Sequence, residues 1–299
     1  MKPIVRERIC EESNYYALFC NGETLRFYIR DGEEMKSPNM PELYDISINN
    51  KCSGGCPYCY ASAKNSGKNY ENIVDKIKGF FTPMAMNERP FQIAVGGAGE
   101  PTEHPDFIPF MEAVAEMSVM PNYTTNGTII TDEILQCAAS TCGGVAVSAH
   151  EHLPWQTVVE AYSSAGSKTN IHVVIGMEDT AIKLQRWYDQ FVNMVDYFVL
   201  LPYIPQGRAK PLDVADEYDK MFKWLETVGY EKVAFGAYFF SEIEKRKVPA
   251  YTYDVHMFSS YLDMDEMKMS ESSFHGTRPN TSPQSGEHIS SKTGAGERQ

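Results

Sequence analysis

From Leu43 onward, short apolar segments alternate with longer segments that have helical periodicity. The apolar segments have the length and composition of buried strands and occupy residues 43–49, 91–97, 121–126, 144–150, 170–176 and 197–203. Six strand-then-helix units in succession require parallel strands joined by right-handed crossover connections. The sequence therefore predicts an α/β fold, either a barrel or a doubly wound sheet.

The amphipathic segments between these strands are expected to be helices that cover the sheet. In residues 70–81, and again in residues 107–117, apolar side chains recur on one helical face. Thr131 precedes two acidic residues and is expected to cap a helix at 132–139. Two more helices are expected at 180–195 and 213–226.

The residues before the barrel are expected to form a small element of their own. Asn21-Gly22 lies between two strand-like runs within residues 15–30, which is a strong signal for a hairpin with a two-residue turn. We therefore expect residues 1–42 to form a short N-terminal β-hairpin element and residues 43–230 to form the barrel.

Two segments follow the barrel. Residues 231–274 are expected to form a C-terminal extension that packs on the barrel, with a further strand within 233–240. Residues 275–299 are almost free of apolar side chains and rich in Ser, Gly, Thr and Pro. That composition is typical of a disordered tail or of added, non-native sequence.

Charge and composition exclude several classes of function. The 299 residues carry a formal net charge of -13 and no long basic run, so a nucleic acid is not expected as a partner. No segment approaches the roughly 18 consecutive apolar residues of a membrane span, and no export signal is visible. We therefore expect a cytoplasmic protein without membrane contact, and in a reducing compartment clustered cysteines bind metal or do redox chemistry.

Three of the seven cysteines follow the first predicted strand directly, at the spacing C-x3-C-x2-C: Cys52, Cys56 and Cys59. Active sites of parallel α/β folds lie at the carboxyl ends of strands. A structural zinc site needs a fourth Cys or His in a matching motif. The remaining cysteines are scattered and are expected to be buried or without a role: Cys10, Cys20, Cys137 and Cys142. A [4Fe–4S] cluster held by three thiolates instead leaves one iron open to an outside ligand.

This cysteine motif, with Tyr58 just before its last cysteine, resembles the signature of the radical S-adenosylmethionine superfamily. "AVGGAGEPTEHPDF" resembles the Gly-Gly-Glu-Pro motif of that family, with Ala98-Gly99 inserted before Glu100. "YTTNG" and "VAVSAH" are similar to the family's third and fourth strand ends, and "LLPYIPQGRA" to the segment over the adenine. The resemblance covers Leu43 to Lys210, and its motifs follow the family order at consecutive strand ends.

The resemblance implies a partial (β/α)6 barrel with a [4Fe–4S] cluster on Cys52, Cys56 and Cys59. It also implies that a further set of residues binds S-adenosylmethionine: Tyr58, Gly96, Gly97, Gly99, Glu100, Thr125, Ser148 and Leu201. Because no cysteine follows Cys142, a single cluster is expected. Candidates for facing the substrate are His150, His152, Tyr203, Gln206, Arg208 and Tyr238, although single His and Tyr residues are more often structural.

The activity implied is reductive cleavage of S-adenosylmethionine to a 5′-deoxyadenosyl radical, which abstracts hydrogen from a peptide, a small metabolite or a nucleoside. An external reductant of the flavodoxin or ferredoxin type and an anaerobic setting are expected. Two alternatives remain open: an iron–sulfur electron-transfer or binding module that does not cleave S-adenosylmethionine, and a zinc-binding structural protein. The sequence assigns neither the substrate nor a catalytic side chain.

Overall fold

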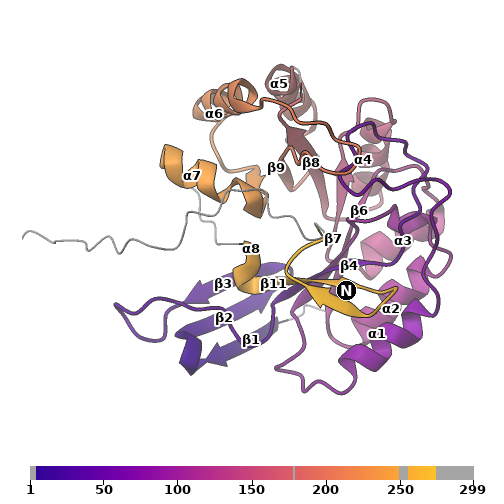
Figure 1. The fold of residues 1–299 in the computed structure, drawn as a ribbon, viewed down its shortest axis with the longest axis vertical. Helices are drawn as coiled ribbons and strands as arrows, with labels where there is room; N and C mark the ends of the chain where they lie inside the picture. Colours follow the sequence, from indigo (N-terminus) through magenta and orange to yellow (C-terminus); the bar gives the residue numbers. More distant parts are fainter. Residues whose placement is uncertain (1–4, 178, 249–254, 274–299) are drawn as a thin grey trace, which may run out of the picture.

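The computed structural model describes residues 5–177, 179–248 and 255–273. Its main body is a nine-stranded sheet in the order β10-β9-β8-β7-β6-β5-β4-β11-β12 (Figure 1). The six predicted barrel strands are confirmed as β4 (Leu43–Ser47), β5 (Gln92–Val95), β6 (Met120–Thr125), β7 (Gly144–Ser148), β8 (Thr169–Ile175) and β9 (Tyr197–Pro202). Each pairs in parallel with the next along the chain, so the fold is the predicted α/β partial barrel.

Helices cover the outer face of this sheet (Figure 1). They are α1 (Ile73–Phe81), α2 (Phe107–Glu116), α3 (Asp132–Ser140), α4 (Trp155–Ser164), α5 (Thr180–Phe191) and α6 (Ala215–Val228). Five were predicted, and the hydroxyl of Thr131 caps α3 by accepting from the Ile134 amide. Helix α4 was not predicted, although its buried residues Trp155, Val158, Val159 and Tyr162 have helical spacing.

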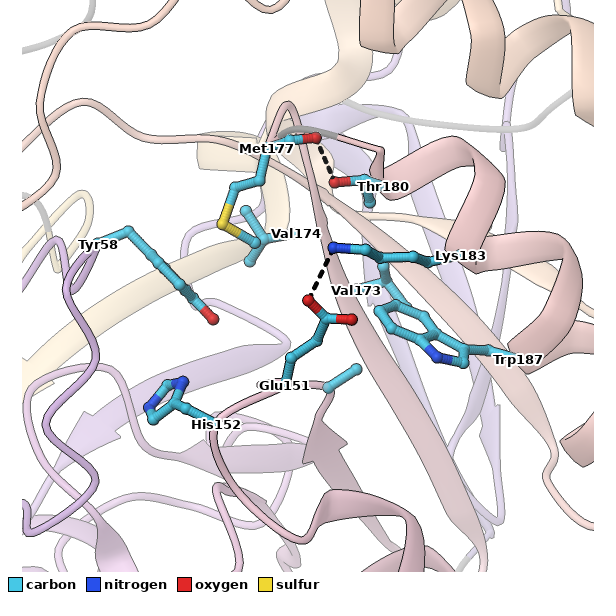
Figure 2. A pocket seen from close by; sticks show the side chains of 10 residues that line it. Tyr58, Glu151, His152, Val173, Val174, Met177, Thr180, Lys183 and Trp187 are labelled. Carbon is cyan, nitrogen blue, oxygen red and sulfur yellow. Dashed lines mark hydrogen bonds and ion pairs between the residues drawn. The ribbon is translucent and has the colours of Figure 1, made fainter.

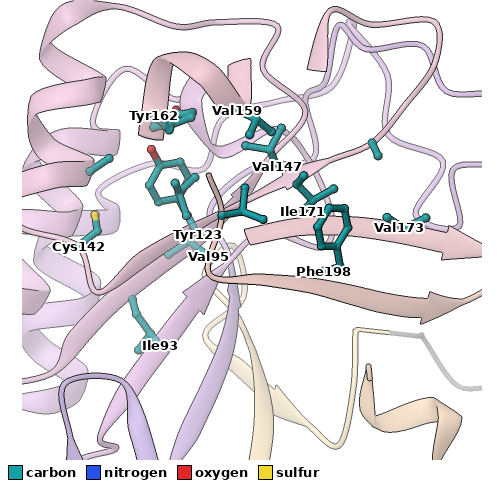
Figure 3. Packing of buried hydrophobic residues seen from close by; sticks show 14 of the residues in the cluster. Ile93, Val95, Tyr123, Cys142, Val147, Val159, Tyr162, Ile171, Val173 and Phe198 are labelled. Carbon is teal, nitrogen blue, oxygen red and sulfur yellow. The ribbon is translucent and has the colours of Figure 1, made fainter. Parts of the chain in front are cut away.

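The hydrophobic core lies between the sheet and these helices. Side chains of a strand alternate between its two faces, so every second residue points into this core. Figure 3 shows Val95, Tyr123 and Val147 of neighbouring strands packed together with Val159 and Tyr162 of α4. The intervening residues of each strand face the inside of the barrel, and most of them are less buried.

The N-terminal element has three strands: β1 (Val5–Cys10), β2 (Tyr15–Cys20) and β3 (Glu23–Phe27). The β2–β3 hairpin is confirmed, and Asn21 (φ 51°) and Gly22 (φ 96°) have the positive φ angles that its two-residue turn requires. Strand β1 was not predicted. Phe19 stacks on Phe91, which immediately precedes β5, so this sheet packs against the amino ends of the barrel strands.

The C-terminal extension contributes to both edges of the large sheet. On one edge β10 (Val233–Phe235) pairs with β9, and the chain then continues into α7 (Phe240–Arg246). On the other edge, after α8 (Val255–Phe258), β11 (Ser259–Asp263) pairs in parallel with β4 and is followed by β12 (Lys268–Ser270). Of the strand expected within 233–240, only the first three residues form a strand. The tail predicted at 275–299 lies outside the described residues.

In the part of the chain that the structure describes, no helix has the length and apolar character needed to cross a membrane.

Candidate active site

The loop after β4 carries Cys52, Cys56 and Cys59 at the carboxyl edge of the sheet. Arg208, which follows β9, holds this loop: its Nε donates to the Cys56 carbonyl oxygen at 3.0 Å and its amide to the Cys59 carbonyl oxygen at 2.9 Å. Gly207 precedes it with φ 60°, and a Cβ there would stand 2.2 Å from the carbonyl oxygen of Tyr60. Arg208, a candidate for facing the substrate, therefore serves to fix the cysteine loop.

The three thiols of the loop lie in one another's electrostatic field. Burial raises the pKa of Cys56 to about 11, and the nearby Cys52 and Cys59 raise it further. Burial is also the main cause of the raised pKa of Cys52. The Cys52 and Cys56 thiols are therefore protonated at neutral pH without a metal, and iron must displace their protons when it binds. As a donor set, three clustered sulfurs in one loop fit an iron–sulfur cluster.

Within the described ranges, no group of three or more His, Cys, Asp or Glu side chains is arranged to hold a metal ion.

Asn126, at the end of β6, contacts the first cysteine of the loop. Its Nδ2 donates to Cys52 Sγ at 3.2 Å, and the Gly54 amide donates to the same sulfur at 3.4 Å. A Cβ on Gly54 would lie 2.6 Å from that Nδ2, so glycine is needed for this approach. Sequence reasoning missed Asn126, although it is the residue after Thr125 in "YTTNG".

The glycine-rich turn after β5 packs against the cysteine loop. Gly97 has φ 86°, a conformation that favours glycine. A Cβ on Gly99 would stand 2.4 Å from Asn49 Oδ1 and 2.6 Å from the Lys51 carbonyl oxygen. The next amide, of Glu100, donates to that same carbonyl at 2.8 Å. The turn and the loop are thus held in contact by their backbones.

Glu100 is almost completely buried, and its carboxylate joins the ends of β5 and β6. It accepts from Thr125 Oγ1 and from the Asn126 amide, both at 2.7 Å, and from Thr102 Oγ1 at 2.8 Å. Burial raises its pKa, whereas these donors lower it. Glu100 and Thr125 were both expected to contact S-adenosylmethionine, and here they are hydrogen-bonded to each other. Because Glu100 also accepts from the Asn126 amide, it helps to hold Asn126 beside Cys52.

Glu103 also connects the segment after the glycine-rich turn to the cysteine loop. Its Oε1 accepts from the amide and the hydroxyl of Ser53, both at 2.6 Å, and from Thr128 Oγ1 at 3.3 Å. Sequence reasoning did not single out this residue. Its signal was its position, three residues after the acid of the glycine-rich motif; in the structure it ends the short 3-10 helix Pro101–Glu103.

Two histidines lie beside the cysteine loop. Tyr58 Oη and His150 Nδ1 are hydrogen-bonded at 2.8 Å, and His152 Nε2 lies 3.0 Å from the Gly54 carbonyl oxygen. Burial, and then the nearby His152, lower the pKa of His150 to about 4, so its imidazole is neutral at pH 7. Tyr203, by contrast, donates its hydroxyl to the Lys210 carbonyl oxygen and stabilises its own loop.

A pocket of about 220 Å³ opens where β7 and β8 end (Figure 2). Tyr58 and Met177 extend into it, and its lining is mainly apolar and aromatic: Tyr58, Ala149, Glu151, His152, Val173, Val174, Met177, Thr180, Lys183 and Trp187. An ion pair of 2.7 Å between Lys183 Nζ and Glu151 Oε2 borders it. Such a wall suits a flat ring with a few polar atoms. Ser148 and Leu201 are half-buried on the inner faces of β7 and β9.

Three comparisons place this geometry among known proteins. Residues 46–152 match the family model of the Radical SAM superfamily. Over 86 residues the chain is 30% identical to the 7,8-dihydro-6-hydroxymethylpterin dimethyltransferase of Methanocaldococcus jannaschii. That match covers 28% of this chain and only 17% of the relative.

The fold is similar to that of two solved structures. For Streptococcus suis SuiB bound to S-adenosylmethionine, the TM-score is 0.65 at 13% identity, over 88% of this chain and 80% of that chain. For anSMEcpe with bound AdoMet and Cp18Cys peptide, the TM-score is 0.57 at 16% identity, over 79% of this chain and 75% of that chain. At such low sequence identities, the comparison shows a shared fold and nothing more.

Proposed function

We propose that this chain, whose residues 46–152 match the family model of the Radical SAM superfamily, cleaves S-adenosylmethionine reductively at a [4Fe–4S] cluster held by Cys52, Cys56 and Cys59. The resulting 5′-deoxyadenosyl radical then abstracts hydrogen from a substrate. The proposal rests above all on the meeting of three strand ends at one thiol. Cys52 follows β4, Glu100 follows β5 and Asn126 follows β6, and Asn126 connects them: its Nδ2 donates to Cys52 Sγ and its amide donates to the Glu100 carboxylate.

The cluster and S-adenosylmethionine would supply the electron transfer and the carbon radical, and the protein's part is to hold and orient them. The two donors to Cys52 Sγ, from Asn126 and Gly54, stabilise negative charge on that sulfur. Arg208 fixes the backbone that carries Cys56 and Cys59. Each cysteine is thereby positioned before the cofactor binds, which lowers the entropy cost of the bound geometry.

We place the adenosine part of S-adenosylmethionine in the pocket at the ends of β7 and β8. The ring of Tyr58 and the side chains of Val174 and Met177 offer apolar contacts for a base, and they exclude water from the carbon that becomes a radical. Neutral His150 holds the Tyr58 hydroxyl at 2.8 Å and so orients that ring. Ser148 and Leu201 are proposed to contact the cofactor from the inner faces of their strands.

The substrate is proposed to be a peptide or a small molecule. Two proteins of similar fold have been solved in complex with peptides, SuiB with the precursor peptide SuiA and anSMEcpe with the Cp18Cys peptide, which favours a peptide here. A flavodoxin or ferredoxin is proposed as the external electron donor, because the sequence contains no second cysteine cluster.

The test is release of 5′-deoxyadenosine by protein that has been reconstituted anaerobically with iron and sulfide, reduced with dithionite and given S-adenosylmethionine. We expect release by the native protein and by Cys20→Ala, which removes an exposed cysteine far from the loop. Cys56→Ala should release none. Equal release by Cys56→Ala and the native protein would refute the proposal.

The same samples separate the alternatives. An electron-transfer module would be brown, but its electron-paramagnetic-resonance spectrum would not change when S-adenosylmethionine is added. A zinc protein would contain stoichiometric zinc and show no visible absorbance after reconstitution.

A further inference from the structure

Asp45 is the central residue of β4 and points to the inside of the barrel. Its neighbours Tyr44 and Ile46 are buried on the opposite face, where the Tyr44 ring meets Phe80 edge-on at 5.7 Å between centroids. Because side chains alternate along a strand, the Asp45 carboxylate stands on the inner face, where it is exposed. β4 is also the strand that leads into the cysteine loop.

Two phenols stand near Asp45. Tyr261 of β11 is its register partner and donates to Ser47 Oγ at 2.6 Å, and Tyr60 directly follows the last cysteine of the loop. Burial is the main cause of the raised pKa of Tyr60 and of Tyr261, and the charge of Asp45 adds to it in both. Asp45 thus lies between the end of the cysteine loop and the strand that covers β4.

Asp45 differs from the other acids of the site because it has no partner. Glu100 and Glu103 each accept several hydrogen bonds, whereas in the described ranges Asp45 makes no hydrogen bond and no ion pair. The surrounding protein raises the pKa of Asp45 to about 6, so at pH 7.5 it is mainly ionised. Because the pKa of Asp45 is raised in the folded state, its ionised form makes folding less favourable.

No cation on strands β5 to β9 compensates this charge. The inward-facing residues of β5 to β9 that the structure describes include neither Lys nor Arg: Gln92, Ala94, Asn122, Thr124, Ala146, Ser148, Asn170, His172, Val174, Tyr197, Val199 and Leu201. Burial lowers the pKa of His172 to about 4, so its imidazole is neutral as well. The inner faces of β5 to β9 are therefore neutral. On the other side of β4, Asp263 of β11 shares the face of Asp45 and is in register with Lys268 of β12.

We propose that Asp45 binds an alkylammonium group of the substrate and so holds the substrate on the inner wall below the cysteine loop. The inference rests on the proposed function for the reaction, but the binding itself needs only the carboxylate. The ammonium group would belong to a lysyl side chain of a peptide or to a free amine. A carboxylate–ammonium pair enclosed by protein discriminates against a neutral isostere by about tenfold or more.

Thermal unfolding of native protein and Asp45→Asn provides the first test. If the carboxylate serves to bind a ligand, the melting temperature of the D45N variant at pH 7.5 should be no lower than that of native protein, and higher by up to about 2 °C. The difference should shrink as the pH falls below about 6 and should vanish below about pH 4, where Asp45 is protonated in the folded and the unfolded chain alike. The phenols of Tyr60 and Tyr261 stay neutral over this range, since the pKa of each is raised.

Asp263→Asn is the matched control, because Asp263 lies on β11 beside Ser47 and already accepts from the Asp265 amide at 2.7 Å. This variant should melt at a lower temperature than native protein. If D45N melts lower than native protein at pH 7.5, Asp45 has a structural partner and the proposal is wrong.

The second test measures binding to cluster-loaded protein without reductant, by isothermal titration calorimetry with S-adenosylmethionine present. The probes are acetyl-lysine amide, its neutral isostere acetyl-norleucine amide, and cadaverine. We expect the lysine probe to bind about tenfold more tightly than the norleucine probe at pH 7.5. D45N should abolish that preference, and so should pH 5.

Tighter binding of acetyl-lysine amide than of cadaverine identifies a peptide substrate, and the reverse order identifies a free amine. Equal binding of the lysine and norleucine probes, or a preference that survives in D45N, overturns the proposal. Because no turnover is required, amine binding without any 5′-deoxyadenosine release would refute the proposed function and leave the Asp45 site standing.

Discussion

Asn126 is the side chain through which the third barrel strand reaches the proposed cluster. An N–H group that donates to a ligand sulfur stabilises the reduced, more negative state of an iron–sulfur cluster, so removing the donor lowers the reduction potential. We expect Asn126→Leu to lower the midpoint potential by an amount on the order of tens of millivolts, measured by a redox titration followed by electron paramagnetic resonance.

Asn122→Leu is the control for this prediction. Asn122 lies on the same strand, but its amide donates to Gln92 Oε1 and to the Ile93 carbonyl oxygen, both at 3.1 Å. Its loss should leave the cluster potential unchanged. Equal potentials in both variants and the native protein would show that the Asn126 contact does not tune the cluster.

His172 connects the inner wall to the acid stability of the protein. Burial lowers its pKa to about 4 in the folded state, whereas an unfolded chain has the ordinary value near 6.5. Between these values the unfolded state binds the proton more readily, so stability is complete above about pH 6.5 and is lost as the pH falls toward 4.

His172→Gln should remove this part of the acid sensitivity. We expect its free energy of unfolding to fall less between pH 7 and pH 4.5 than that of native protein, by on the order of 1–2 kcal/mol. Urea unfolding of the metal-free proteins at a series of pH values measures the difference. Parallel pH profiles would contradict the low pKa of His172.

At the scale of elements, the glycine-rich turn is the part of the site with the least steric freedom. We expect Gly99→Ala to destabilise the protein by about 1–3 kcal/mol in urea unfolding, because the new methyl would overlap Asn49 Oδ1 and the Lys51 carbonyl oxygen. Iron uptake on reconstitution should fall as well, since the turn supports the cysteine loop.

Gly79→Ala is the matched control in α1, where a Cβ meets no atom within 4 Å. It should leave iron uptake unchanged and should stabilise the protein slightly, because alanine is the better helix former. Similar iron uptake and stability in G99A and G79A would mean that the turn and the loop separate easily.

The six barrel strands and most of the helices were predictable because their signals are local. Alternation and helical spacing specify each element, and the Thr131 cap and the Asn21-Gly22 turn were readable from a few residues. The cysteine spacing likewise predicted the position of Cys52, Cys56 and Cys59 at a strand end.

What could not be predicted depends on contacts between distant segments. The pairing of β11 with β4 joins residues more than 200 positions apart, and no pattern within either strand indicates it. The roles of Asn126 and Arg208 are of the same kind, because each contacts the cysteine loop from another strand end. The eight residues expected to contact S-adenosylmethionine remain predictions: Tyr58, Gly96, Gly97, Gly99, Glu100, Thr125, Ser148 and Leu201.

At the scale of the whole molecule, the N-terminal sheet and the barrel share a second core. Phe19 is fully buried and stacks on Phe91 with 5.3 Å between ring centroids. Arg8, also buried, lies over the same Phe91 ring and donates to the carbonyl oxygens of Met40 and Arg89. The sheet should therefore unfold together with the barrel.

Phe19→Ala should destabilise the entire molecule by about 3–5 kcal/mol. We expect one cooperative transition in urea, with tryptophan fluorescence from the barrel and far-ultraviolet circular dichroism shifting together. Phe27→Ala, at a side chain that is 46% exposed, should change stability by less than about 0.5 kcal/mol. A separate early transition in F19A would show that the sheet folds independently.

The pairing of β11 with β4 also has a consequence for how the protein is made. The ribosome releases β4 and its cysteines early, but β4 gains its outer neighbour only after Ser259–Asp263 has been synthesised. Contacts of such sequence separation form late, since a long loop must close first. Until then the edge of β4 is open and the inner wall around Asp45 is incomplete. Delivery of iron and sulfide to the cysteine loop is thus expected to follow translation rather than accompany it.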